Sequence, residues 1–172
     1  MSLLLNKKNL AFFLDRDGVV NEDRGYVFNK NQIKWKKNIF KALKYICEHN
    51  YKIIIVTNQS GIGRGYYKEK DVKILHAWMK NIFLKKKIQN VYFYYAPYYK
   101  FSKQKKYRIN SNLRKPNPGM IKKAAKKHKI LIKKSFLIGD KVTDLKAGKK
   151  AGVKSFIVEN DIYKQVQRII NP

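Results

Sequence analysis

Cysteine, arginine and acidic residues are all scarce in this chain of 172 residues. The single cysteine, Cys47, excludes an internal disulfide framework and a metal cage built from several thiolates. Cys47 falls at helical spacing with Ile39, Leu43 and Ile46, a pattern that predicts a small core residue rather than a nucleophile.

Long apolar runs are lacking as well. No run approaches the roughly 20 residues that a membrane-spanning helix needs, so no membrane partner is expected. Leu3, Leu4 and Leu5 form too short a run for a signal-peptide core, and no small-residue cleavage site follows them. Because internal repeats and low-complexity linkers are also lacking, we expect one domain over residues 1–172. The lack of a membrane or signal segment, together with the single cysteine, predicts a cytoplasmic protein, and we expect a monomer.

The charge of the chain is one-sided, with 40 lysines and arginines against 11 acidic residues and a net charge of +29. Only six of the basic residues are arginines, and the other 34 are lysines spread along the chain. Proteins that read nucleic acids favour arginine, whose planar fork matches phosphates and bases. Lysine accompanies other residues with A/T-rich codons here, so genome bias explains the excess at least as well. We interpret the charge as a solvated surface and expect no nucleic-acid partner.

Short apolar segments alternate with helical patterns along the whole chain. The segments predict buried strands at residues 10–14, 53–57, 91–95, 136–139 and 155–158. The periodic stretches between and after them predict helices near residues 39–47, 72–83, 118–128, 144–151 and 161–170. This alternation indicates an α/β fold, a three-layer, doubly wound parallel sheet, in which ligands bind at the carboxyl ends of the strands.

Two carboxylates, Asp15 and Asp17, follow the first predicted strand directly. An extended backbone points side chains two positions apart to the same side, so the pair suits a cation or a phosphate chemistry. The alternative is a surface turn, because Asp17-Gly18 is a common turn pair.

Further polar residues follow the later strands. Thr57 offers a hydroxyl for a phosphate oxygen, or alternatively caps a helix. Arg114 and Lys115 stand before a predicted helix, where cations are unfavourable unless an anion is bound nearby. Asp140 offers oxygen ligands to a hard cation such as Mg²⁺, and Asp144 is either a further acid of the site or a first-turn acid of its helix.

The order of these residues resembles the haloacid dehalogenase (HAD) superfamily of phosphatases. Within it, the chain is similar to the D,D-heptose 1,7-bisphosphate phosphatase and histidinol-phosphatase family in five segments: FLDRDGVVN (13–21), GYV (25–27), TNQSGIGRG (57–65), RKPNPGM (114–120) and GDK (139–141). The resemblance implies a HAD-like, Rossmann-like core without a large cap domain.

The resemblance also implies roles for individual residues. Asp15 would be the nucleophile that forms an aspartyl-phosphate, and Asp17 the general acid and base. Thr57 and Lys115 would hold the oxygens of the transferring phosphoryl group. Mg²⁺ would be bound by Asp15, the backbone carbonyl of Asp17 and Asp140. The substrate-binding residues would be Arg16, Asp23, Arg24, Gly25, Tyr26, Asn58, Gln59, Ser60, Arg114 and Lys141.

One departure from this family concerns zinc. Its members commonly carry a structural zinc loop, and the corresponding positions here are Ala96, Tyr98, Ser111 and Leu113. None of these side chains is a good zinc ligand, so zinc is expected to be absent. The loop over residues 94–107 must then be ordered by packing or remain mobile.

The resemblance implies a Mg²⁺-dependent phosphatase that removes the 7-phosphate of heptose 1,7-bisphosphate for lipopolysaccharide or surface-heptose synthesis. One alternative is a histidinol-phosphate phosphatase, which shares the same motifs, although Arg114 and Lys141 suit a bisphosphate better than a cationic amine. The other is a basic nucleic-acid-binding protein or a nucleic-acid 3′-phosphatase. His76, within a predicted helix, is expected to be a surface or packing residue.

Overall fold

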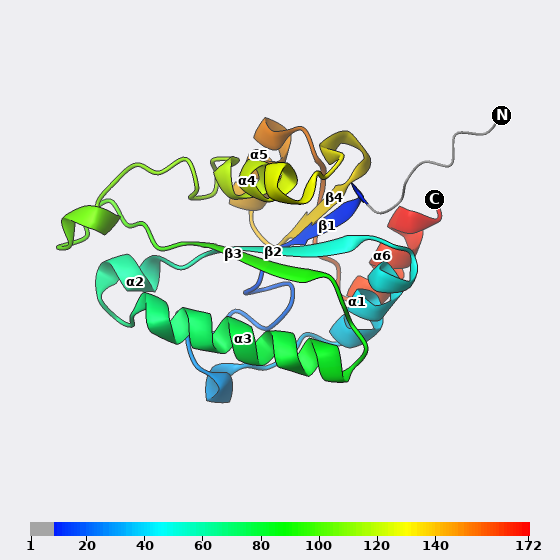
Figure 1. Ribbon diagram of the computed structural model, residues 1–172, viewed down its shortest axis with the longest axis horizontal. Helices are drawn as coiled ribbons and strands as arrows, with labels where there is room; N and C mark the ends of the chain where they lie inside the picture. The colour runs from blue at the N-terminus through cyan, green and yellow to red at the C-terminus, as the bar shows by residue number, and fades with distance from the viewer. Residues whose placement is uncertain (1–8) are drawn as a thin grey trace.

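The computed structural model describes residues 9–172, and within them it contains a five-stranded sheet in the order β3-β2-β1-β4-β5 (Figure 1). All pairings are parallel. The strands are β1 (Ala11–Leu14), β2 (Lys52–Asn58), β3 (Val91–Ala96), β4 (Phe136–Gly139) and β5 (Lys154–Ile157). The parallel α/β architecture and the positions of the strands confirm the sequence prediction.

Helices cover both faces of the sheet, which makes three layers. α1 (Ile39–Glu48), α3 (Glu69–Lys85) and α6 (Ile162–Ile170) lie on one face, and α4 (Gly119–His128) and α5 (Val142–Ala151) on the other (Figure 1). The short α2 (Ser60–Arg64) follows β2 directly, where the sequence left a phosphate-binding loop and a helix-capping turn as alternatives. Single 3-10 turns occur at Lys30–Gln32, Lys105–Tyr107 and Ile132–Lys134.

The alternation of side chains along β1 shows why this strand is buried on both sides. Phe12 and Leu14 pack into the core that α1, α3 and α6 cover, whereas Ala11 and Phe13 pack toward α4 and α5. A strand buried on both faces needs no polar positions, which accounts for its uninterrupted apolar sequence.

The predicted segments agree with the observed elements except at a few ends. Cys47 is partly buried and packs against the core, as its helical spacing predicted. The leucines at positions 3–5 lie outside the described residues. No helix in residues 9–172 is long and apolar enough to cross a membrane.

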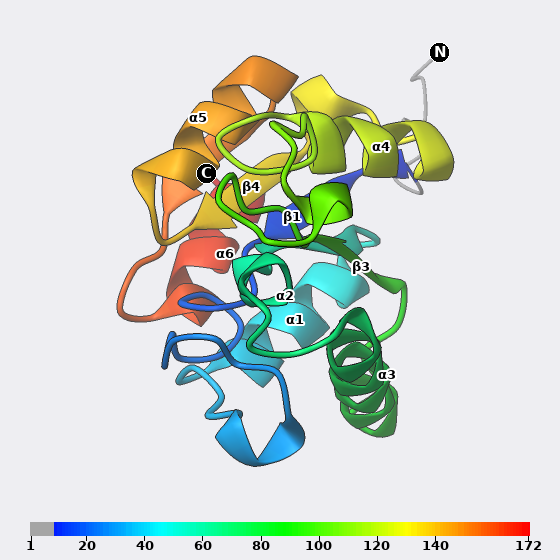
Figure 2. The same cartoon turned by 90° about the vertical axis from the view of Figure 1, so that its left-hand side faces the viewer.

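The carboxyl ends of the parallel strands lie along one edge of the molecule, which Figure 2 views directly. Chain order reverses at β1, because β2 lies on one side of it and β4 on the other. Ligands in such sheets bind at this switch point. Asp15 follows β1 directly and therefore lies at the position where the fold predicts the site.

Candidate active site

A cavity of about 490 Å³ opens at the carboxyl edge of the sheet. The loops after β1 and β2, the loop before α4 and the first turn of α5 contribute to its wall. Its lining residues are Asp15, Asp17, Asp23, Gly25, Tyr26, Thr57, Asn58, Gln59, Ser60, Tyr67, Arg114, Lys115, Lys141 and Thr143. The fold thus brings together residues that are more than 120 positions apart in the sequence.

Lys115 is the buried cation of this site. Its Nζ lies 2.9 Å from Asp15 Oδ2, forms a second ion pair with Asp144, and donates a hydrogen bond of 2.9 Å to the Val56 carbonyl. Burial alone would lower the pKa of Lys115, but Asp15 and Asp144 reverse this effect and raise it. The ammonium therefore stays charged beside the two carboxylates.

Asp15 is held in a largely water-free position. Burial raises the pKa of the Asp15 carboxyl to about 7, although the Lys115 ammonium acts in the opposite direction. Its Oδ1 accepts a hydrogen bond of 2.7 Å from the backbone N–H of Arg16. A buried carboxylate with a perturbed pKa at the end of a strand is a candidate nucleophile.

Three carboxylates, from Asp15, Asp140 and Asp144, offer oxygens that all lie within 4.8 Å of one another. The Oδ1 atom of Asp140 is buried and makes no hydrogen bond with the described residues. An unsatisfied carboxylate oxygen beside two other acids fits a hard divalent cation, which takes oxygen ligands. Gly18, at φ +94°, makes room for this cluster, because a Cβ there would overlap the Asp140 carboxylate.

Thr57, near the end of β2, and Gln59, directly after it, are both buried beside the cavity. Gln59 Nε2 donates to Thr57 Oγ1 at 2.9 Å, so the Thr57 hydroxyl accepts there and its own O–H remains available as a donor. Tyr67 fixes the other end of the amide, because its hydroxyl donates to Gln59 Oε1 at 2.7 Å. Burial raises the pKa of Tyr67 to about 12, which keeps this donor protonated.

Asp17 accepts hydrogen bonds from side chains of three other residues. Arg16 donates from Nε and Nη2 at 2.9–3.1 Å, Asn21 from Nδ2 at 2.9 Å and Gln59 from Nε2 at 3.0 Å. The carboxylate is 17% exposed and faces the cavity. Its orientation is therefore fixed from several sides while one side remains accessible.

Most of the predicted substrate-binding residues line the cavity, but Arg16 and Arg24 do not. Arg16 is fully buried beneath it, with its guanidinium bonded to Asp17, His76 and Val27. Arg24 is exposed outside the cavity wall. The prediction that Arg16 contacts substrate is corrected, because its fork is used inside the protein. A substrate contact by Arg24 stays a prediction.

Asp23 and Lys141 form an ion pair of 2.7 Å across the mouth of the cavity. This hydrogen bond lowers the pKa of Asp23 and raises the pKa of Lys141. Deeper in, the amide of Asn58 exchanges two hydrogen bonds of 3.0 Å with the backbone of Lys115. Asn58 therefore lines the cavity and also holds the loop that carries the buried lysine.

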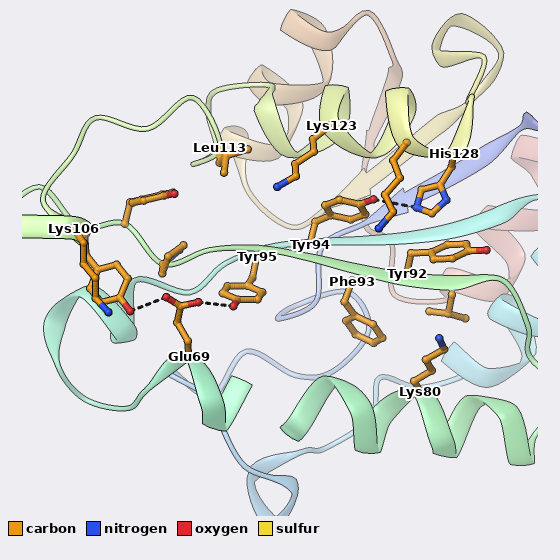
Figure 3. A pocket seen from close by; sticks show the side chains of 15 residues that line it. Glu69, Lys80, Tyr92, Phe93, Tyr94, Tyr95, Lys106, Leu113, Lys123 and His128 are labelled. Carbon is orange, nitrogen blue, oxygen red and sulfur yellow. Dashed lines mark hydrogen bonds between the residues drawn. The ribbon is translucent and has the colours of Figure 1, made fainter. Parts of the chain in front are cut away.

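The segment at the positions of the family's zinc loop is ordered by tyrosines. The Tyr95 and Tyr107 hydroxyls each donate a hydrogen bond of 2.7 Å to the Glu69 carboxylate, which lowers the pKa of Glu69 (Figure 3). Tyr99 N–H bonds the Tyr107 carbonyl at 3.0 Å, and the Arg64 guanidinium stacks 3.8 Å above the Tyr99 ring. Packing and hydrogen bonds hold this segment, one of the two outcomes that the sequence left open.

A separate hollow of about 620 Å³ runs along the edge strand β3, between α3 and α4 (Figure 3). Tyr92 and Tyr94 point toward α4, where the Tyr94 hydroxyl lies 3.0 Å from His128 Nε2. Glu69 is the one acid among the described residues that line this hollow, and tyrosine hydroxyls already occupy its oxygens. The acid cluster and buried lysine distinguish the catalytic edge from this hollow.

Some residues of the site were left open or were not identified from the sequence. For Asp144 the sequence left two roles open, an acid of the site and a first-turn acid of its helix, and the structure shows both. Asp144 accepts a hydrogen bond of 3.1 Å from the Lys141 backbone N–H at the start of α5, and it forms an ion pair with Lys115 in the site. Asn21 donates a hydrogen bond to Asp17. The only sequence signal for this contact is that Asn21 lies four residues after Asp17 in the same motif. His76 is buried rather than at the surface, and its contact with Arg16 left no sequence signal.

Comparison with known proteins finds similarity to HAD-like hydrolases. The family model described as HAD-hydrolase-like matches residues 112–170. A putative HAD-like phosphatase from Mesorhizobium loti superposes with a TM-score of 0.81 at 25% identity, covering 94% of this chain and 85% of its own. The D,D-heptose 1,7-bisphosphate phosphatase of B. bronchiseptica, solved with magnesium and phosphate, has the same fold, with a TM-score of 0.77 at 22% identity over 92% and 86% of the two chains.

The curated relatives with similar sequences define the family within the HAD-like hydrolases. The D-glycero-beta-D-manno-heptose-1,7-bisphosphate 7-phosphatase of Helicobacter pylori (strain J99) is 42% identical, covering 86% of this chain and 81% of the relative. The alpha-anomer enzyme of Burkholderia mallei is 44% identical, covering 85% and 77%. The chain belongs to the heptose-1,7-bisphosphate 7-phosphatase family.

Proposed function

We propose that this protein is a Mg²⁺-dependent phosphatase that removes the 7-phosphate of D-glycero-D-manno-heptose 1,7-bisphosphate, for lipopolysaccharide or surface-heptose synthesis. The observation that carries the proposal is the buried Asp15 carboxylate, paired with Lys115 at the switch point of the sheet and open to a cavity lined by the family's residues. The names of the relatives supply the substrate.

Asp15 acts as the nucleophile in this proposal. One of its oxygens attacks the phosphorus of the 7-phosphate, and the bond from phosphorus to the sugar oxygen breaks, which leaves an aspartyl-phosphate. In this proposal Lys115 and the Thr57 hydroxyl hold the phosphoryl oxygens, where charge develops in the transition state. Their positions are fixed beforehand, by Val56 and Asn58 for Lys115 and by Gln59 for Thr57.

Asp17 moves the protons. In the first step the protonated carboxyl gives its proton to the leaving sugar oxygen, which departs as a hydroxyl. In the second step the carboxylate takes a proton from the water that attacks the phosphorus of the aspartyl-phosphate. The bond from phosphorus to Asp15 then breaks, inorganic phosphate leaves, and both aspartates return to their starting states.

Asp15, Asp140 and the backbone carbonyl of Asp17 are the proposed Mg²⁺ ligands, and Asp144 lies within reach as a further acid. The unsatisfied Oδ1 of Asp140 supports this assignment. When bound, Mg²⁺ supplies positive charge that reduces the repulsion between a dianionic phosphate and the attacking carboxylate. We propose no zinc site. The segment at the positions of the family's zinc loop is ordered by hydrogen bonds from the Tyr95 and Tyr107 hydroxyls to Glu69.

A second anion is favoured at the mouth of the cavity. Burial and the neighbouring Arg64 guanidinium lower the pKa of Arg114, because two cations lie close together there. A second phosphate would relieve this repulsion, whereas the cationic amine of histidinol phosphate would increase it. This contrast favours the bisphosphate over histidinol phosphate.

Phosphate release from four substrates, with and without Mg²⁺, tests the proposal. The panel is the alpha and beta anomers of heptose 1,7-bisphosphate, histidinol phosphate and an oligonucleotide with a 3′-phosphate. We expect the highest kcat/KM for a heptose bisphosphate and loss of turnover when Mg²⁺ is chelated. A higher kcat/KM for histidinol phosphate or for the oligonucleotide would show that the heptose bisphosphate is not the preferred substrate.

A further inference from the structure

His76 lies in the middle of α3 and is almost completely buried. Its ring stacks on Phe93 of β3 at a centroid distance of 4.5 Å. Its Nε2 lies 3.1 Å from Nη1 of Arg16. Arginine can only donate, so the imidazole accepts this hydrogen bond through an unprotonated Nε2. Burial and the Arg16 charge lower the pKa of His76 well below its usual range, which is consistent with a neutral acceptor.

Arg16 is the fully buried link between His76 and the cavity. Its Nη2 donates to the Val27 carbonyl and to both oxygens of Asp17, while Nε donates to Asp17 Oδ1 at 3.1 Å. The guanidinium is planar, so anchoring Nη1 at one side fixes the direction of the Nε and Nη2 donors at the other. The contact with His76 therefore determines how the fork meets the Asp17 carboxylate.

We propose that His76 is a positioning residue for phosphoryl transfer: it orients the Arg16 fork, which in turn holds Asp17 at the leaving-group oxygen. This inference rests on the proposed role of Asp17 as the general acid. His76 does not touch the substrate, because it does not line the cavity, and it acts only through Arg16.

A positioning role for His76 affects two kinds of substrate differently, which a purely structural role does not. A sugar hydroxyl is a poor leaving group and needs the proton from Asp17, whereas p-nitrophenolate is a weak base and leaves without it. Misplacing Asp17 should therefore slow hydrolysis of the sugar phosphate much more than hydrolysis of p-nitrophenyl phosphate. General loss of folding would slow both reactions alike.

The test compares two variants with the wild-type protein. His76→Leu removes the acceptor, and His76→Gln keeps an acceptor of similar reach. For His76→Leu we expect kcat with heptose 1,7-bisphosphate to fall by about 10- to 100-fold, part of the 10²–10⁴-fold that general acid catalysis supplies, and kcat with p-nitrophenyl phosphate to fall by less than about threefold. His76→Gln should recover most of the lost sugar-phosphate activity.

The control is His49→Leu, which changes a histidine at the C-terminal end of α1, outside the cavity lining, and should change neither rate. Equal losses on both substrates, no loss on either, or no recovery in His76→Gln would overturn the proposal. If His76→Leu does not fold by circular dichroism, His76→Asn, with its shorter reach, takes its place.

Failure of the proposed function is recognised separately, in the wild-type protein. If the wild type hydrolyses another alkyl phosphate better than the heptose bisphosphate, the substrate assignment is wrong. The comparison of alkyl and aryl substrates is then made with that alkyl phosphate, and the result still decides the role of His76.

Discussion

The Nζ atom of Lys115 lies 2.9 Å from Oδ2 of Asp15, and the two side chains are 2% and 10% exposed. The same ammonium pairs with Asp144, so one buried cation serves two buried carboxylates. The buried ammonium is tolerated in a medium of low dielectric constant because two carboxylates pair with it. Removing the lysine would leave both carboxylates buried without a compensating charge. The pair therefore belongs to the stability of the fold as well as to the proposed chemistry.

Replacing this lysine tests its structural role. We expect Lys115→Met to lower the free energy of unfolding by about 3–5 kcal/mol at pH 8, because two carboxylates lose their buried partner. The loss should be smaller at pH 5.5, since Asp15, whose pKa burial already raises to about 7, then takes up a proton and no longer needs a cation. Urea unfolding at both pH values measures the difference.

Lys141→Met is the matched control, because Lys141 is more than half exposed and its shorter ion pair, with Asp23, lies at the surface. Surface pairs contribute about 0–1 kcal/mol. Equal destabilisation by the two substitutions would contradict the buried-pair account.

Mg²⁺ should stabilise the folded protein through the acid cluster. Binding to the native state alone raises stability with ligand concentration, by about 2.7 kcal/mol at 100 times Kd. We expect the Tm of the wild-type protein to rise on adding Mg²⁺, and the rise to disappear in Asp140→Asn, which loses the unsatisfied carboxylate. Thermal melts with Mg²⁺ and with a chelator measure this. An identical rise in Asp140→Asn would remove Asp140 from the metal site.

Glu69 should order the tyrosine-rich segment in a pH-dependent way. Hydrogen bonds from Tyr95 and Tyr107 lower its pKa in the folded state, so their stabilising effect is present above the ordinary carboxyl pKa and is lost as the pH falls through the folded value. We expect Tyr107→Phe to speed tryptic cleavage at Lys100, Lys103, Lys105 and Lys106 at pH 7.

The pH dependence is measured separately by thermal melts, because trypsin itself loses activity in acid. The Tm difference between the wild type and Tyr107→Phe should shrink below the carboxyl range. Tyr66→Phe, at an exposed tyrosine, is the control. Cleavage at the wild-type rate in Tyr107→Phe would show that this hydrogen bond does not order the segment.

Arg114 should contribute to recognition of the second phosphate. A hydrogen bond to a charged group contributes about 1.5–3 kcal/mol, so Arg114→Ala should raise KM for heptose 1,7-bisphosphate about tenfold or more. KM for p-nitrophenyl phosphate, which has one phosphate, should change little. Steady-state kinetics of Arg114→Ala and of the exposed-site control Arg108→Ala measure both values. A similar rise for both substrates would instead indicate a general role in folding the loop.

The sequence was sufficient for the sheet and for the acids at the strand ends. Apolar runs such as Phe12–Leu14 can hardly be solvent-exposed, and residues that follow parallel strands meet at one edge whatever the loops between them do. That is why Asp15, Thr57 and Asp140 could be placed together without coordinates, whereas Lys115, in the loop before α4, was placed with them by the resemblance to the phosphatase family.

Contacts between side chains on different elements could not be predicted in the same way. A lone histidine in a helix has no pattern that indicates a buried arginine as its partner, so the His76 contact was not foreseen. Arg16 lies inside a motif of site residues, yet its fork turns into the protein rather than toward the cavity. The tyrosines that hold Glu69 are 26 and 38 positions away from it, and only packing brings them together.

The most direct test of the account is a single-turnover reaction with heptose 1,7-bisphosphate labelled in its 7-phosphate, quenched in acid. We predict that label remains attached to the wild-type protein, maps to Asp15 and is absent from Asp15→Asn, which keeps its fold and loses turnover. Phosphate release by Asp15→Asn at a rate near that of the wild type would contradict the assignment of Asp15 as the nucleophile.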